Sequence, residues 1–234
     1  MIRAEALHKQ YGSIKALDGV GLTVDRGRTL ALFGPNGAGK TTLIRVLSLL
    51  ARPSSGSIEI NGLAAGRDDD AIRAGIGVLS HTSFLYEQLT ARENLLFYGK
   101  MYGVRDARQR ADALLERVSL ADRADGLVRG FSRGMRQRVA IARCLMHQPA
   151  VVLLDEPYTG LDRHASQALT EMLQQLRGEN RTILITTHHI SEAFALADEL
   201  AVMVKGRMVL HRPCAGTDPR DFAQLYLRCV EAGQ

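Results

Sequence analysis

Residues 30–42 read LALFGPNGAGKTT and limit the possible folds more narrowly than any other part of the sequence. A short apolar run that predicts a buried strand breaks at Gly34, and an apolar pattern of helical period begins at Leu43. Between them, the spacing from Gly34 to Thr41 matches G-x-x-x-x-G-K-[ST]. Glycines let the backbone bend tightly and turn its N–H groups inward on an anion, and the N-terminus of the following helix favours the same charge.

The side chains of this stretch suit the same ligand. Lys40 supplies a fixed positive charge for β- and γ-phosphates, and the Thr41 hydroxyl can ligate Mg²⁺. The alternative is a glycine-rich turn that happens to contain Lys-Thr, and the flanking strand and helix disfavour it. The stretch therefore predicts a nucleoside triphosphate site. Its expected nucleotide-binding residues are Gly34, Pro35, Asn36, Gly37, Ala38, Gly39, Lys40, Thr41 and Thr42.

Length and composition suit a single α/β domain with an embedded subdomain, since 46% of the 234 residues are hydrophobic. No apolar stretch approaches the ~18 residues of a membrane-spanning helix, and the N-terminus lacks the apolar run of a signal peptide. A role at a membrane would therefore need another chain to span it. The three cysteines form no C-x-x-C pair, which indicates neither a disulfide framework nor a zinc site and fits a reducing cytoplasm.

The formal net charge of +5 comes mainly from arginine, whose densest group lies between Arg129 and Arg143. One interpretation of that group is a nucleic-acid or anionic lipid surface. A solvated helix face is the favoured interpretation, because no aromatic residues interleave and no basic tail projects. We therefore expect no nucleic-acid partner.

The order of apolar patterns predicts an α/β fold. Alternation in residues 2–30 predicts an antiparallel β portion, whereas the unbroken runs Val151–Leu154 and Thr182–Thr186 predict parallel core strands. The alternating residues at the start of the antiparallel portion are Ile2, Ala4 and Ala6. Residues 82–148 contain no convincing strand and read as helices, and Thr90 with Glu93 predicts a capping box that opens a helix ending at about Tyr102. We expect a single domain over 1–234, with its core in 1–81 and 149–212, a helical subdomain in 82–148 and a C-terminal tail or helix in 213–234.

Polar side chains should converge at one edge of the core sheet. The phosphate loop, the pair Asp155 and Glu156, and His188 each follow a predicted buried strand, and parallel strands bring their carboxyl ends to the same edge. Asp155, with Thr41, suits a Mg²⁺ contact, and Glu156 can orient or deprotonate an attacking water. Taken alone, the acidic pair would also fit a helix cap, and His188 a structural histidine. Tyr11 is either an aromatic at a strand end or the ring on which adenine stacks.

These motifs together resemble those of the ATP-binding cassette (ABC) ATPases over about residues 2–212. Residues 131–138, FSRGMRQR, are similar to the cassette signature, which is normally Leu-Ser-Gly-Gly-Gln. The motifs DEP at 155–157 and GLD at 160–162 follow it, as in that family. The resemblance implies ATP hydrolysis and a phosphate-loop NTPase fold. That fold has a mainly parallel core sheet, an N-terminal antiparallel β portion and an inserted helical subdomain.

The same resemblance implies partners. Two subunits would pack head to tail, as a homodimer or paired cassette, with each ATP between one chain's phosphate loop and the other's signature. Ser132 and the Gly134 N–H would contact the γ-phosphate across the interface, and Asp162 would link the two sites. Tyr11 would stack on adenine and His188 would be the switch histidine. Separate transmembrane permease subunits and a peripheral position on the cytoplasmic face of the cell membrane are implied as well.

Three positions depart from the family pattern. Arg133 replaces the first glycine of the signature and Met135 its glutamine, while Ser132 and Gly134 remain. His81, a further nucleotide-binding candidate, stands where most of the family has the glutamine that senses Mg²⁺ and water. Histidine can donate or accept a hydrogen bond, but its charge changes near physiological pH.

Only a second resemblance gives an indication of the transported cargo. His81, with ENLLFY at 93–98, is similar to the ATPase subunit of the haem exporter used in cytochrome c maturation. The alternatives are an exporter ATPase for lipid, drug or another small cargo, and a non-transport ABC ATPase such as an iron–sulfur assembly factor. A non-enzymatic interpretation has the chain bind ATP only as a structural switch.

Overall fold

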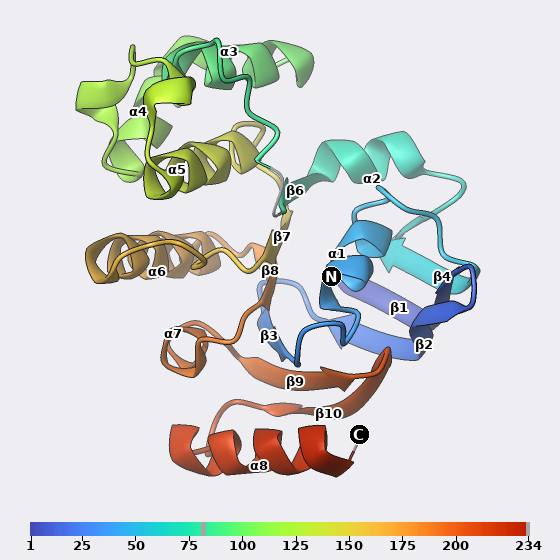
Figure 1. The fold of residues 1–234 in the computed structure, drawn as a ribbon. Coiled ribbons are helices and arrows are strands. Elements are labelled where there is room, and N and C mark those ends of the chain that lie inside the picture. Colours follow the sequence, from blue (N-terminus) through green and yellow to red (C-terminus); the bar gives the residue numbers. More distant parts are fainter. Residues whose placement is uncertain (81–82, 233–234) are drawn as a thin grey trace.

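The computed structural model describes residues 1–80 and 83–232, which are arranged around a six-stranded sheet (Figure 1). The strand order is β10-β9-β3-β8-β7-β6. All neighbours pair in parallel except β10, which runs antiparallel to β9 at one edge. The strands are β3 (Thr29–Phe33), β6 (Ile76–Leu79), β7 (Val151–Asp155), β8 (Thr182–Thr186), β9 (Glu199–Val204) and β10 (Arg207–Pro213).

The central strands β3, β7 and β8 are buried along their whole length because both faces of the sheet are covered. In β3, Leu30 and Leu32 pack on the side of helix α1 (Lys40–Leu47) and the N-terminal sheet. Ala31 and Phe33 point to the other side, into a core shared with helix α6 (Arg163–Gly178) and helix α8 (Pro219–Ala232). The period-two alternation of strand side chains thus divides the core into two layers.

A second, antiparallel sheet has the order β2-β1-β4-β5. Its strands are β1 (Ile2–Tyr11), β2 (Ile14–Val24), β4 (Ser55–Ile60) and β5 (Leu63–Ala64). The expected alternation holds at Ile2 and Ala4 but is wrong at Ala6, which is exposed while Leu7 is fully buried. The register shifts between Ala4 and Leu7, and Ala6 has φ +45°. A β-bulge therefore moves the buried position by one residue.

Helices gather on one side of the six-stranded sheet, above it in Figure 1. They are α3 (Ala91–Met101), α4 (Ala107–Arg117) and α5 (Arg133–Cys144), with 3₁₀ turns at Ala121–Arg123 and Val128–Gly130. The predicted capping box that opens α3 is confirmed: Thr90 and Glu93 each accept a hydrogen bond from the other's backbone N–H. Buried residues such as Leu95, Leu114 and Val139 hold the three helices together.

The remaining helices flank the sheets. Helix α2 (Asp69–Gly75) precedes β6, and α7 (Ile190–Phe194) lies between β8 and β9 in the chain. Helix α8 packs through Phe222, whose ring centroid is 4.9 Å from that of Phe33. Over the described ranges, every helix is too short or too polar to cross a membrane.

Candidate nucleotide site at the carboxyl edge of the parallel sheet

The phosphate loop joins β3 to α1, and its glycines are required by the space available. A Cβ built at Gly34 would lie 2.3 Å from the carbonyl oxygen of Met203, and one at Gly39 would lie 2.4 Å from that of Ala16. Gly39 also adopts φ +105° as the residue before helix α1. Larger residues at these two positions would push the loop away from β2 and β9. The loop residues from Pro35 to Thr42 line a hollow of about 410 Å³.

Lys40 begins α1 and turns back into this loop. Its side chain is only 8% exposed, and its Nζ donates hydrogen bonds to the carbonyl oxygens of Gly34 (2.6 Å) and Pro35 (3.3 Å). The same Nζ lies 3.7 Å from Oε1 of Glu156. A buried ammonium group at a helix N-terminus provides the electrostatic environment that a triphosphate needs.

Glu156 stands between Lys40 and His188. Its Oε2 hydrogen bonds with Nδ1 of His188 at 2.8 Å, so the carboxylate joins the phosphate loop to the end of β8. The backbone of Glu156 has φ +49°, which is uncommon for a residue with a side chain. Its N–H donates to both the carbonyl oxygen (3.1 Å) and the hydroxyl (3.0 Å) of Thr186, and these bonds stabilise the conformation.

Asp155, the last residue of β7, is buried at 4% exposure. Its Oδ1 accepts a hydrogen bond of 2.7 Å from the Thr186 hydroxyl, because Asp155 and Thr186 are paired in the β7–β8 register. Sequence reasoning did not single out Thr186. The sequence did place a threonine at the end of one predicted strand and an aspartate at the end of another. The register between the two strands was needed to interpret it.

Tyr11 lies at the end of β1 and is 44% exposed, with Lys9 Nζ 4.8 Å from its ring centroid. It is not among the residues that line the phosphate-loop hollow, so its contact with adenine stays a prediction. The hollow is instead lined on that side by Ile14, Lys15 and Ala16 of β2. Sequence reasoning missed these three residues, because their position depends on how the antiparallel sheet packs beside the loop.

The residues expected to act across a dimer interface, Ser132, Gly134 and Asp162, lie at the starts of helices α5 and α6. Ser132 caps α5, its Oγ accepting a hydrogen bond from the Met135 N–H at 3.2 Å, and Asp162 caps α6 through the Ala165 N–H at 2.8 Å. Ser132, Gly134 and Asp162 are absent from the lining of the loop hollow. His81, the remaining nucleotide-binding candidate, lies outside the described residues.

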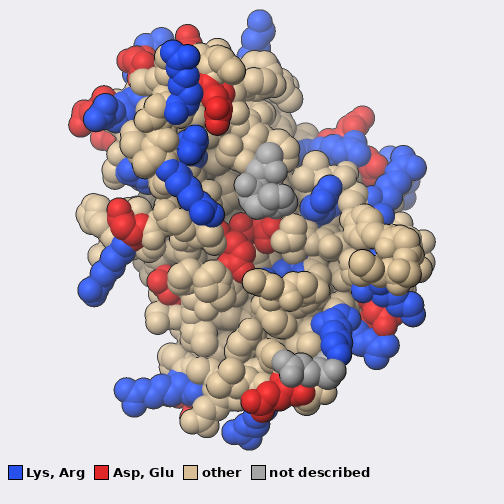
Figure 2. Space-filling model, in the orientation of Figure 1, with Lys and Arg blue, Asp and Glu red and all other residues tan. Residues whose placement is uncertain are grey.

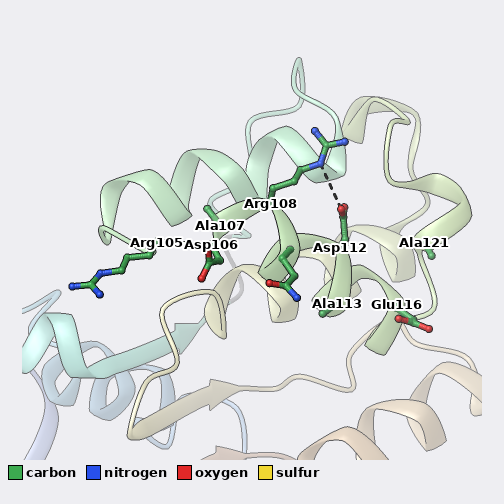
Figure 3. A pocket seen from close by; sticks show the side chains of 9 residues that line it. Arg105, Asp106, Ala107, Arg108, Asp112, Ala113, Glu116 and Ala121 are labelled. Atoms are coloured by element: carbon green, nitrogen blue, oxygen red, sulfur yellow. Dashed lines mark ion pairs between the residues drawn. The ribbon is translucent and has the colours of Figure 1, made fainter.

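Figure 2 shows acidic side chains in the middle of this face, below the helical group and surrounded by more peripheral Lys and Arg residues. A larger hollow, of about 850 Å³, lies elsewhere, on the outer surface of α4 (Figure 3). It is lined by charged and small side chains, and Arg108 pairs with Asp112 within it (Nε–Oδ2 3.5 Å). The phosphate loop and the acidic pair contribute nothing to this second hollow.

A strand, glycine loop and helix with a buried lysine, facing an acidic pair at the end of another parallel strand of the same sheet, define a phosphate-loop nucleoside triphosphatase. Residues 17–159 match the ABC transporter family. The chain is 45% identical over 210 residues to the daunorubicin resistance ATP-binding protein DrrA3 of Streptomyces coeruleorubidus. That alignment covers 89% of this chain and 66% of DrrA3, so the chain spans slightly less than two thirds of this longer relative.

A further relative and a solved structure indicate the same family. Identity to the ABC transporter ATP-binding protein NatA of Bacillus subtilis is 39%, over 84% of this chain and 81% of NatA. A dimeric ATP-binding cassette solved in a post-hydrolysis state with ADP and Pi superposes with a TM-score of 0.86. It is 27% identical, over 93% of this chain and all of that structure. The chain belongs to the ABC transporter family, as an ATP-binding cassette that hydrolyses ATP.

Proposed function

We propose that this chain is the ATPase subunit of an ABC exporter and that Glu156 activates the attacking water. The catalytic role of Glu156 is inferred from the position of its carboxylate. Oε1 lies 3.7 Å from Nζ of Lys40, and Oε2 lies 2.8 Å from Nδ1 of His188. A triphosphate bound by the loop would place its terminal phosphate beside Lys40, and Glu156 is then within reach of a water in line with it. His188 orients the carboxylate and contacts the same phosphate.

Mg²⁺ fits the donors at this edge. Thr41 contributes a hydroxyl from the hollow's lining, and Asp155 contributes a buried carboxylate held by Thr186. Oxygen donors of this kind suit Mg²⁺, which takes one or two protein ligands and completes its shell with phosphates and water. When bound, the ion neutralises charge that develops on the phosphates during hydrolysis. Thr41 and Asp155 are the residues that would hold it.

A second copy of the cassette completes the site in this proposal. Ser132 and Gly134 lie outside the hollow of their own chain, yet Ser132 is exposed at the N-terminus of α5, where an anion is favoured. Head-to-tail pairing would bring these residues to the partner's γ-phosphate, with Asp162 at the junction of the two sites. The superposition on a dimeric cassette supports this arrangement.

The membrane partner would dock beside the helical group. Aromatic side chains cluster there, with Tyr86 and Phe97 exposed and Tyr98 half-buried. The ring centroids of Tyr86 and Phe97 are 4.9 Å apart, and those of Phe97 and Tyr98 are 5.3 Å apart. A hollow of about 220 Å³ adjoins them, lined by Phe84 and Tyr102 among others. We assign this surface to an amphipathic helix of a separate transmembrane permease subunit, at the cytoplasmic face of the cell membrane. Residues 82–148 would then form the subdomain that receives the signal, and 1–81 with 149–212 the catalytic core.

The cargo is proposed from the names of the relatives. DrrA3 is named for daunorubicin resistance, LnrL of Bacillus subtilis for linearmycin resistance, and a protein from Ralstonia nicotianae for Nod factor export. These names favour export of a drug-like or lipid-like molecule over haem export. None of the three names refers to haem, and the expectation of haem rested partly on His81. Co-purification in detergent tests the transporter itself, because a solely water-soluble partner would instead favour an assembly-type ATPase.

Replacing Glu156 with glutamine tests the catalytic assignment. The amide keeps the shape of the side chain but cannot accept the proton, so we expect phosphate release to fall by about 100-fold or more. ATP binding should be retained, since Lys40 and the loop are unchanged. A Lys40→Ala variant is the matched control, and it should lose binding as well. Wild-type phosphate release by Glu156→Gln would contradict the assignment of Glu156 as the residue that activates the water.

A further inference from the structure

Arg133 makes a contact that the glycine of the usual signature could not make. It is the first residue of α5, and its side chain lies over Gly160 in the segment after Glu156. A Cβ built at Gly160 would be 2.7 Å from Nε and 2.8 Å from Cδ of Arg133. Gly160 also has φ +80°. The outer part of the arginine side chain therefore occupies the space that a Cβ at residue 160 would fill.

Two further contacts join helix α5 to the segment that follows Glu156. Gln137, one turn beyond Arg133 on the same face of α5, donates a hydrogen bond from Nε2 to the carbonyl oxygen of Pro157 at 3.0 Å. A Cβ built at Gly134 would lie 3.6 Å from the carbonyl oxygen of Gly160 and 3.7 Å from Cδ2 of Leu161. The first two turns of α5 thus pack along residues 157–161, which we call the post-Glu156 loop.

The post-Glu156 loop is short and is fixed at both ends. At one end the Glu156 N–H is bonded to Thr186 of β8, and at the other Asp162 caps helix α6. Within the loop the Thr159 N–H donates to the Glu156 carbonyl oxygen at 3.1 Å. Only a few residues therefore separate the middle of the loop from the backbone of Glu156, which already has an uncommon φ.

We propose that Arg133 is a positioning residue whose aliphatic stem fastens the post-Glu156 loop to helix α5, so that α5 and the backbone of Glu156 move together. This inference rests on the proposed role of Glu156. The stem rather than the charge carries the effect, because among the described residues no ion pair or hydrogen bond of the Arg133 guanidinium is found. Long charged side chains commonly stabilise structure through such packing of their methylene groups.

Three substitutions of Arg133 in the full chain distinguish the effect of its methylene groups from the effect of its charge. Arg133→Gly removes the stem, and we expect kcat for ATP hydrolysis to fall by about 5- to 10-fold with KM for ATP changed by less than about twofold. Arg133→Met keeps a long apolar side chain without charge and should retain at least about half of the wild-type kcat. Arg133→Lys should behave like Arg133→Met. The matched control is Arg163→Gly, which removes an exposed arginine from the same first position of helix α6.

Hydrogen exchange gives a readout that is independent of hydrolysis. We expect the amides of Thr159 and Leu161 to exchange about 3- to 10-fold faster in Arg133→Gly, and at the wild-type rate in Arg133→Met and Arg163→Gly. Unchanged exchange and kcat in Arg133→Gly would overturn the proposal, as would rescue by lysine but not by methionine. If Glu156→Gln hydrolyses ATP normally, the proposed role of Glu156 fails, whereas the exchange rates still report whether Arg133 fastens the loop.

Discussion

Thr186 shows how one small side chain organises the acidic pair. It is fully buried, its hydroxyl donates to Asp155 Oδ1 at 2.7 Å and accepts from the Glu156 N–H at 3.0 Å, and its own carbonyl oxygen accepts from the same N–H. The hydroxyl therefore fixes the direction of one carboxylate and the backbone of the other. In a buried site, a hydrogen bond of this kind also offsets part of the free-energy cost of removing a carboxylate from water.

Thr186→Val keeps the shape of the side chain and removes these bonds. We expect the free energy of unfolding to fall by about 1–3 kcal/mol, because Asp155 is left without its buried partner. We also expect kcat to fall by about tenfold as the acidic pair loses its orientation. Urea unfolding and phosphate release measure the two effects. Thr23→Val, at an exposed position of β2, should change stability by less than about 0.5 kcal/mol, and an equal loss there would contradict this explanation.

Among the secondary-structure elements, α3, α5 and β6 meet at His147, which contacts residues at the end of α3 and in β6. It follows α5, its ring stacks on that of Tyr102 at the end of α3 (centroids 3.9 Å apart), and its Nε2 hydrogen bonds with the Ile76 carbonyl oxygen at 2.9 Å. Burial lowers the pKa of His147 below 6.5, and the nearby charges of Arg143 and Arg181 act in the same direction, against the opposing hydrogen bond to Ile76. The direction of this shift favours the neutral form of the imidazole in the folded chain.

The stability of this junction should depend on pH with a definite sign. Because the pKa of His147 is lower in the folded chain, the unfolded chain binds more protons below about pH 6.5, and acidification destabilises the fold in that window. His147→Gln should reduce the loss of unfolding free energy between about pH 6.5 and 5. Chemical unfolding at several pH values measures it, with His164→Gln on exposed α6 as control. An unchanged slope in His147→Gln would show that other groups cause the loss.

Helices and strands with a strong local sequence pattern were predictable from the sequence. Features that depend on contacts between residues far apart in the sequence were not. The run Thr182–Thr186 coincides with β8, and Thr90 with Glu93 predicted the start of α3, because strand hydrophobicity and helix capping are local signals. The bulge at Ala6 was missed because a bulge depends on the partner strand. The packing of Arg133 on Gly160 was missed for the same reason, since the two residues belong to different elements.

For the whole molecule, strand direction determines where chemistry can occur. The parallel strands β3, β7 and β8 end at one edge, which brings Lys40, Glu156 and His188 together although they are far apart in the sequence. Convergence of this kind was predictable from the order of the motifs. The residues that complete the nucleotide hollow from β2 were not, because they depend on how two sheets pack. Ser132 and Gly134 remain outside this hollow, which leads to the proposal of a second copy.

Sedimentation of Glu156→Gln with saturating ATP tests the paired cassette most directly. Blocking hydrolysis should trap ATP between two chains. We therefore expect a species of twice the 25.6 kDa of the single chain, which dissociates when ATP is removed. Adding Lys40→Ala should abolish this species by removing the phosphate contact. A Glu156→Gln chain that binds ATP yet still sediments at 25.6 kDa would contradict the proposed pairing of two cassettes.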